Sequence, residues 1–265
     1  MRALVLAILL AGSPVPGFAD CRQALVIGLD VSGSVDAREF LFQVRGLAQA
    51  LRSDRVRRLL LERPEVPVML AAFDWSGEAD QRLILPWTVL GDSGAVDRAA
   101  ATIAATVRIP RSPATGVGAA LLFGDRLLAE QEHCWRQVLD LAGDGLNNSG
   151  PQPRDVMLEA RARPVTVNAL VVGVNRDAGW DGGDPGIAEL TAWFATEVIR
   201  GPDAFVEAAL GYENFAVAME RKLLKELSGI EVSALSAPEV NRTGRETLAT
   251  AGPAAPHEWA TAAAQ

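Results

Sequence analysis

Two short, mostly apolar runs in this chain end at an aspartate, and this pattern constrains the fold. The first run covers residues 24–29 and precedes Asp30, and the second covers residues 138–143 and precedes Asp144. Apolar runs of this length are typical of strands buried on both faces of a parallel sheet. Because ligand sites of such sheets lie beyond the carboxyl ends of the strands, we expect the two aspartates to share one site.

The rest of the chain alternates between strand and helix patterns. Further strands are expected at residues 66–73, 81–87, 135–142 (which contains most of the second run), 165–172 and 204–208. Helices are expected at residues 36–52, 95–107, 116–130, 153–163, 187–199 and 212–227. A turn at residues 74–78 makes a hairpin, so one edge strand is expected to be antiparallel. The sequence therefore predicts an α/β fold with a mostly parallel, six-stranded sheet.

The first residues have the features of an export signal. Arg2 is followed by an apolar stretch and then by small residues that fit cleavage after Ala19. We therefore expect residues 1–19 to be a signal peptide and the protein to be exported, either to the periplasm or outside the cell. The alternatives are an uncleaved anchor and a lipid-modified Cys21. Asp20 argues against lipid modification, because that site prefers Gly, Ala or Ser.

Composition limits the class of partner. The formal net charge is −8 and the isoelectric point is near 4.9, which argues against a nucleic-acid partner. No stretch after residue 20 is long and apolar enough to span a membrane. Residues 229–265 are rich in small and polar residues without apolar periodicity, so we expect a disordered tail there. One globular domain is expected over residues 22–228.

The chain has two cysteines, Cys21 and Cys134. They precede Asp30 and Asp144 by nine and ten residues, respectively. If the two strands are parallel neighbours, both cysteines fall at the opposite edge of the sheet. An exported protein lies in an oxidising compartment, so we expect a disulfide between them. The alternative is a pair of buried free thiols.

Five side chains with oxygen atoms stand near the ends of strands or the start of a helix. They are Asp30, Ser32, Ser34, Thr115 and Asp144. Carboxylates and hydroxyls are hard ligands that suit Mg²⁺ or Mn²⁺, with Ca²⁺ as an alternative. The sequence therefore predicts a divalent metal site formed by these residues.

The residues 30–34, Thr115 and the pair 144–145 together resemble the metal-ion-dependent adhesion site (MIDAS) of the von Willebrand factor type A (VWA) domain. More narrowly, the run Gly-Asp-Gly-Leu-Asn-Asn-Ser-Gly-Pro at residues 143–151, behind an export signal, is similar to an uncharacterised bacterial family of secreted VWA-like proteins. The resemblance covers residues 22–228.

This resemblance implies a Rossmann-like, doubly wound sheet with helices on both faces and the metal at its carboxyl edge. It implies that Ser32 and Ser34 ligate the ion directly, and that Asp30, Thr115 and Asp144 do so directly or through water. It also implies that an acidic side chain of a protein or peptide partner completes the coordination. We accordingly expect a metal-dependent adhesion or assembly module with no enzymatic activity.

The strongest rival is a Mg²⁺-dependent phosphatase of the haloacid-dehalogenase type. Residues 143–148 are also similar to a motif of that family, whose nucleophilic aspartate would be Asp30. Two features argue against this assignment. Ser32 stands where that family has a second aspartate, and no lysine precedes residue 144. A structural scaffold with a vestigial metal site is the other alternative.

Several further features could have either a structural role or a role in binding. The acidic, glycine-rich stretch from Asp177 to Asp184, with Trp180, reads as a solvated loop, with a calcium loop as the alternative. Arg111 reads as a solvated cation near the metal site, the alternative being a cation that attracts an acidic ligand. His133 is expected to have a structural role beside Cys134.

Overall fold

The computed structural model describes residues 21–156, 158, 164–173 and 186–228. The predicted signal peptide at residues 1–19 and the predicted tail at residues 229–265 lie outside the described residues. The loop from Asp177 to Asp184, with Trp180, also lies outside them.

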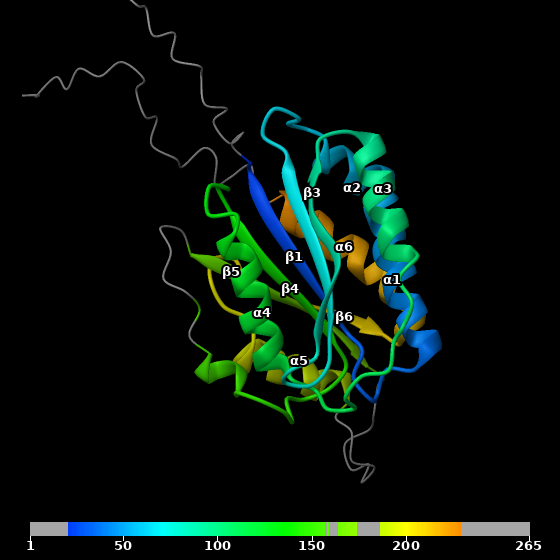
Figure 1. Cartoon of the computed structure of the whole chain (residues 1–265), viewed down its shortest axis with the longest axis vertical. Coiled ribbons are helices and arrows are strands. Elements are labelled where there is room, and N and C mark those ends of the chain that lie inside the picture. Colours follow the sequence, from blue (N-terminus) through cyan, green and yellow to red (C-terminus); the bar gives the residue numbers. More distant parts are fainter. Residues whose placement is uncertain (1–20, 157, 159–163, 174–185, 229–265) are drawn as a thin grey trace, which may run out of the picture.

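One sheet organises the described part of the chain (Figure 1). Its six strands are β1 (Gln23–Asp30), β2 (Val68–Trp75), β3 (Gln81–Leu90), β4 (Gln137–Gly143), β5 (Val165–Gly173) and β6 (Val206–Leu210), in the order β3-β2-β1-β4-β5-β6. β3 pairs antiparallel with β2 at one edge, and the other neighbouring strands pair in parallel. The predicted α/β sheet with an antiparallel edge strand is therefore confirmed.

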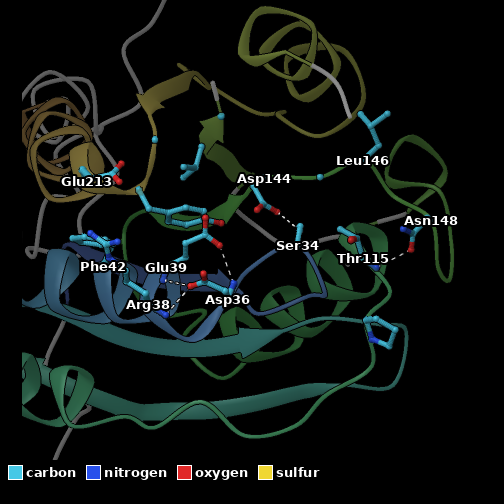
Figure 2. Close-up of a pocket in the computed structure, with 16 residues that line it drawn as sticks. Ser34, Asp36, Arg38, Glu39, Phe42, Thr115, Asp144, Leu146, Asn148 and Glu213 are labelled. Atoms are coloured by element: carbon cyan, nitrogen blue, oxygen red, sulfur yellow. Dashed lines mark hydrogen bonds between the residues drawn. The ribbon is translucent and has the colours of Figure 1, made fainter. Parts of the chain in front are cut away.

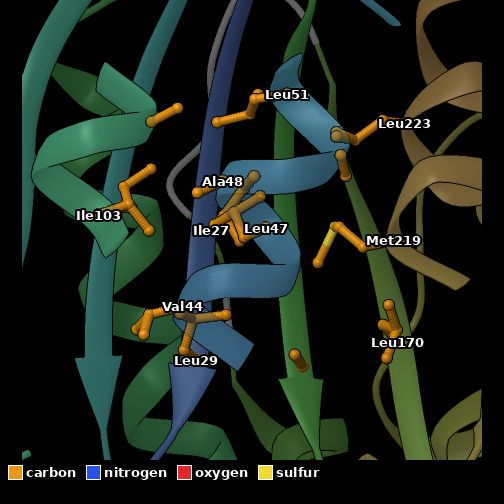
Figure 3. Close-up of a cluster of buried hydrophobic side chains, with 14 of the residues drawn as sticks. Ile27, Leu29, Val44, Leu47, Ala48, Leu51, Ile103, Leu170, Met219 and Leu223 are labelled. Carbon is orange, nitrogen blue, oxygen red and sulfur yellow. The ribbon is translucent and has the colours of Figure 1, made fainter. Parts of the chain in front are cut away.

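Helices cover both faces of this sheet. One face carries α1 (Ala37–Arg52), α2 (Asp54–Leu60), α3 (Ser93–Ala104) and α6 (Phe215–Ser228), and the other carries α4 (Val117–Ala129) and α5 (Ile187–Glu197). Alternate residues of a strand point to opposite faces. Ile27 of β1 therefore joins the core beneath α1, where Leu47 also packs, whereas Val26 joins the core beneath α4. Figure 3 shows the first of these two cores.

The start of α1 is set by a capping box. The Asp36 carboxylate accepts hydrogen bonds from the backbone N–H groups of Arg38 and Glu39, at 2.7 and 2.8 Å. The Glu39 carboxylate accepts one from the backbone N–H of Asp36, at 2.8 Å. These reciprocal bonds satisfy N–H groups that have no partner within the helix, and they fix the end of the loop that follows β1.

A disulfide joins Cys21 to Cys134, as the spacing predicts. In the β1–β4 register, Ala24 lies opposite Gln137. The same separation along the chain, 113 residues, relates the two cysteines. The register therefore places them opposite each other at the amino ends of the two strands.

The helix predicted over residues 153–163 was wrong in its described part. The structure has a short 3₁₀ helix, η1 (Pro153–Asp155), after which Val156 is extended. The guanidinium of Arg200 donates hydrogen bonds to the carbonyls of Pro153 and Val156, at 2.7 and 2.9 Å. These contacts occupy two carbonyls that a continuing helix would use.

Helix α2 was not among the predicted helices. Ser53 interrupts the pattern: its hydroxyl accepts a hydrogen bond from the backbone N–H of Val56 at 3.3 Å and caps a new helix. Arg57 of this helix forms an ion pair with Asp97, at 2.6 Å. Among the described residues, no helix combines the length and apolar character needed to cross a membrane.

Candidate metal centre

The strand order reverses at the centre of the sheet. The chain passes from β1 to β2 on one side, and β4 pairs with β1 on the other side. The crevice beyond the carboxyl ends of such a strand pair is the usual ligand site of open α/β sheets. Asp30 is the last residue of β1 and Asp144 directly follows β4, so both predicted ligands flank this crevice.

Hydrogen bonds tie three loops together around the crevice. The Gly33 N–H donates to the Pro113 carbonyl at 2.9 Å, which joins the loop after β1 to the loop before α4. The Ser34 hydroxyl donates to Asp144 Oδ1 at 2.6 Å, which joins the first loop to the loop after β4 (Figure 2). The predicted ligand residues therefore come from loops that contact one another.

The oxygen atoms of the first loop and of Asp30 lie close together. The hydroxyl oxygens of Ser32 and Ser34 are 3.3 Å apart. Asp30 Oδ1 accepts a hydrogen bond from the backbone N–H of Ser32 at 2.8 Å. Asp30 Oδ2 is buried and has no hydrogen-bond partner among the described residues. Leaving a buried carboxylate oxygen unpaired is costly, so this atom points to a missing positive or donating group.

Glycines on both sides of Asp144 bring its loop against two other predicted ligands. A Cβ atom on Gly143 would lie 3.3 Å from Asp30 Oδ2, and one on Gly145 would lie 3.5 Å from Thr115 Oγ1. Asp30, Thr115 and Asp144 therefore share one site.

The electrostatics of the site favour a cation. Burial, together with the negative charge of Asp144, raises the pKa of Asp30 to about 7. A divalent cation would offset both effects, since it replaces lost hydration and compensates the two carboxylate charges. Two carboxylates and three hydroxyls form a donor set typical of Mg²⁺, Mn²⁺ or Ca²⁺. The donor set and the unpaired oxygen of Asp30 both fit such an ion.

The segment that carries Thr115 is held by two asparagines to which sequence reasoning gave no role. The Asn148 side-chain oxygen accepts a hydrogen bond from the Thr115 N–H at 2.8 Å, and the Thr115 carbonyl accepts one from the Asn148 N–H at 2.9 Å. The Asn147 side-chain oxygen accepts one from the Gly118 N–H at 3.2 Å, in the first turn of α4. The signal was present, because both asparagines belong to the motif at residues 143–151.

Arg108 is a second residue that sequence reasoning missed. Its guanidinium donates hydrogen bonds to the carbonyls of Val31 and Ser32, at 3.1 and 3.3 Å. Arg108 therefore braces the loop after β1 from outside the motif. Nothing in the local sequence marks it, because the contact spans 76 residues of chain.

The family model described as "Protein of unknown function (DUF1194)" matches residues 20–231. This chain belongs to that family. The match includes all five predicted ligand residues and both cysteines. Comparison with curated proteins gives no match.

Solved structures show what this DUF1194 protein resembles in fold. Proximal thread matrix protein 1 from the mussel byssus, with a zinc-occupied MIDAS motif, matches with a TM-score of 0.52 and 14% identity, over 79% of this chain and 48% of that chain. The open conformation of the pilus adhesin SpaC from Lactobacillus rhamnosus GG matches with a TM-score of 0.51 and 15% identity, over 79% and 30%. A von Willebrand factor type A protein from Catenulispora acidiphila has a TM-score of 0.47 and 14% identity, over 78% and 43%.

The DUF1194 chain therefore has a VWA-type fold. It spans less than half the length of each of these three structures.

A cleft of about 620 Å³ adjoins the candidate centre of the DUF1194 protein (Figure 2). Its charged lining residues are Asp36, Glu39, Asp144, Glu213 and Arg38. Burial raises the pKa of Glu39, and the negative charges of neighbouring acids, including Asp144 and Glu213, add to that effect. The cleft is therefore an acidic environment in which a cation is favoured and an anion is repelled.

Arg111 does not have the solvated position expected from the sequence. Its guanidinium forms an ion pair with Asp74 at 2.9 Å and lies 3.8 Å from Asp80, and its side chain is 10% exposed. Asp74 also pairs with Arg82. Arg111 thus ties the loop before α4 to the β2–β3 hairpin.

Cys21, His133 and Cys134 lie close enough to resemble a second metal site, with potential ligand atoms within 4.8 Å of one another. Thiolates are the form of cysteine that binds metal. Both sulfurs are joined in the disulfide, so this cluster has no thiolate to offer.

Proposed function

We propose that this protein is an exported module that binds a protein or peptide partner through a divalent cation, Mg²⁺ or Mn²⁺, held by Asp30, Ser32, Ser34, Thr115 and Asp144. The observation that carries the proposal is the buried, unpaired Oδ2 of Asp30 at the topological switch point of the sheet. The VWA-type fold supports it, since a mussel protein of similar fold has a zinc-occupied MIDAS motif.

The side chains of the site divide the work of binding the ion. The Ser34 hydroxyl donates its proton to Asp144, which leaves its own oxygen lone pairs free for a cation. The Ser32 N–H holds Asp30 Oδ1 and so leaves Oδ2 free to bind. When bound, the cation would supply positive charge and an exchangeable coordination position for an oxygen ligand.

The charge of the cleft makes partner binding depend on the ion. Without a cation, the carboxylates of Glu39, Asp144 and Glu213 repel an acidic side chain. A bound cation would compensate these charges and would offer an oxygen ligand position to a partner's aspartate or glutamate. The partner is therefore an acidic side chain on a protein or peptide, and its binding is lost on chelation.

Export is the natural setting of such a module. The predicted signal peptide and the disulfide between Cys21 and Cys134 both favour an oxidising compartment, either the periplasm or the extracellular space.

The proposal is tested by thermal unfolding of the protein in EDTA and then in excess Mg²⁺ or Mn²⁺. A ligand at 100 times its dissociation constant stabilises the folded state by about 2.7 kcal/mol, which is a measurable shift in melting temperature. We expect the parent to shift and Asp144→Ala not to shift. Asp92→Ala is a matched control, because Asp92 caps α3 beside the amino end of β2, away from the centre. It should lose some stability and keep the full metal-induced shift.

Partner binding is tested with a displayed peptide library selected in Mg²⁺ and counter-selected in EDTA. We expect the selected peptides to share an aspartate or glutamate whose amidation abolishes binding. A parent protein that shows no metal-induced shift would favour a vestigial site. Turnover of a phosphate ester that requires Mg²⁺ and is abolished in Asp30→Asn would instead favour the phosphatase.

A further inference from the structure

Tyr212 stands at the edge of the candidate centre without a role in the motif. It begins the 3₁₀ helix η2 (Tyr212–Asn214), one residue after the end of β6. Gly211 precedes it with a φ of 76°, a left-handed conformation that glycine adopts readily, and its N–H donates to the Gly173 carbonyl at 2.9 Å. Because β6 runs parallel to β5, this turn lies at the carboxyl ends of the strands, where Tyr212 lines the cleft beside Asp144.

The Tyr212 hydroxyl is buried and lacks a partner. The residue is 6% exposed, and its hydroxyl oxygen has no hydrogen-bond partner among the described residues. Asp144 lies close, since both side chains line the same cleft. Burial raises the pKa of Tyr212 well above its usual value, and the negative charges of Asp144 and Asp30 raise this pKa further. The phenol O–H is a hydrogen-bond donor in the same cleft as the Asp144 carboxylate, which can accept it.

The groups near Tyr212 determine which hydrogen bond its hydroxyl can form. Asp144 already accepts the Ser34 proton on Oδ1. The other carboxylates near Tyr212, those of Asp30 and Glu39, accept hydrogen bonds when ionised and cannot donate one. The Tyr212 hydroxyl can therefore act only as a donor towards these acids. Carboxylates that ligate metals are commonly held by an outer hydrogen-bond donor, whose loss typically costs 10- to 100-fold in metal affinity.

We propose that Tyr212 is a positioning residue that donates its hydroxyl proton to the Asp144 carboxylate when the cation is bound. The inference rests on the metal-dependent function proposed above and adds a residue outside the adhesion-site motif. Tyr212 does not touch the ion. It holds the carboxylate in the orientation in which the ion binds.

This role separates affinity from stability. In Tyr212→Phe, the buried ring is kept, so the melting temperature of the cation-free protein should change little. Its affinity for Mg²⁺ should fall by about 10- to 100-fold. A role limited to packing would leave the affinity unchanged, because phenylalanine keeps the ring.

The experiment uses calorimetric titration of the protein with Mg²⁺ and a spectroscopic signal from the same residue. The chain contains one tyrosine, so incorporation of 3-fluorotyrosine yields one ¹⁹F resonance. We expect this resonance to shift as Mg²⁺ is added, with the midpoint of the calorimetric titration. The shift should be absent in Asp144→Asn, which keeps the shape of the side chain and removes its charge.

Each outcome decides between the two proposals. A parent that binds Mg²⁺ with a ¹⁹F shift, beside a weakened Tyr212→Phe, supports both. A parent that binds Mg²⁺ while Tyr212→Phe binds equally well overturns the role of Tyr212 alone. A parent without Mg²⁺ binding overturns the proposed function, and the inference with it. If Tyr212→Phe fails to fold, the fluorotyrosine titration decides: binding without a shift overturns the inference.

Discussion

Lys222 of α6 forms an ion pair with Asp140 of β4, and both side chains are buried. The Lys222 ammonium also lies 2.5 Å from the Glu226 carboxylate, and Asn168 donates a hydrogen bond to the same carboxylate at 2.7 Å. Two carboxylates thus face one ammonium. Burial and the charge of Glu226 raise the pKa of Asp140 well above its usual value, against the lowering effect of Lys222. This network fastens the last described helix to the middle of the sheet.

Removal of Lys222 should therefore be severe. We expect Lys222→Met to destabilise the fold by about 3–5 kcal/mol, because it leaves buried carboxylates without their cation. Guanidinium unfolding measures this change. Lys225 is the matched control, since it is the only other lysine, lies on the same helix and is exposed. Lys225→Met should cost about 1 kcal/mol or less, the usual worth of its contact with the Phe205 ring. Equal losses in the two variants would contradict the prediction.

The cation-free protein should lose stability as the pH rises. The folded-state pKa of Asp30 is about 7, against an ordinary value of 3.8, with burial as the main cause and the charge of Asp144 as the second. Between these values the folded state retains a proton that the unfolded chain releases. The stabilisation is therefore complete below about pH 4 and is lost as the pH passes 7. The shift corresponds to roughly 4 kcal/mol at most.

Asp30→Asn isolates this effect, because an amide stays neutral while the other groups continue to titrate. In EDTA, we expect the variant to be more stable than the parent at pH 8, with the difference shrinking towards pH 4. Denaturant unfolding across this range measures it. In excess Mg²⁺ the difference at pH 8 should shrink, since only the parent binds the ion. Parallel pH profiles of parent and variant in EDTA would contradict the assignment.

Asn148 should support metal binding through Thr115. We expect Asn148→Ala to weaken Mg²⁺ binding and to cost about 1 kcal/mol of stability, because the Thr115 N–H loses its acceptor. Asn148→Asp keeps a side-chain oxygen at the same place and should retain most of the affinity. Calorimetric titration compares the two variants. If both lose affinity equally, the brace on Thr115 is not the reason.

The disulfide should stabilise the fold without affecting the centre. Replacing Cys21 and Cys134 together by serine opens a loop of 113 residues and should cost about 2–5 kcal/mol. A reductant should destabilise the parent by a similar amount and leave the double variant unchanged. Mg²⁺ affinity should be retained, because the bridge lies at the opposite edge of the sheet. A large loss of affinity in the folded variant would show that the two edges are coupled.

Much of the fold could be predicted because its signals are local. The apolar runs before Asp30 and Asp144 report burial on both faces of a sheet, and the spacing of the cysteines anticipates the strand register. A prediction failed where a residue far away in the sequence forms hydrogen bonds with backbone carbonyls of the segment. The carbonyls of Pro153 and Val156 accept hydrogen bonds from Arg200, more than forty residues away, and the short 3₁₀ helix η1 does not continue past Asp155.

The site divides in the same way. The oxygen donors at the strand ends could be identified from the sequence, because they lie in three short segments. The groups that surround these donors depend on how the chain folds. Arg108 braces the first loop, Arg111 pairs with Asp74, and Tyr212 lies beside Asp144, all through contacts between residues far apart in the chain. Hydrophobic periodicity indicates which side chains of a segment are buried, and local propensity indicates which backbone conformation the segment favours. They cannot report which distant charged group or hydroxyl the folded chain places beside that segment.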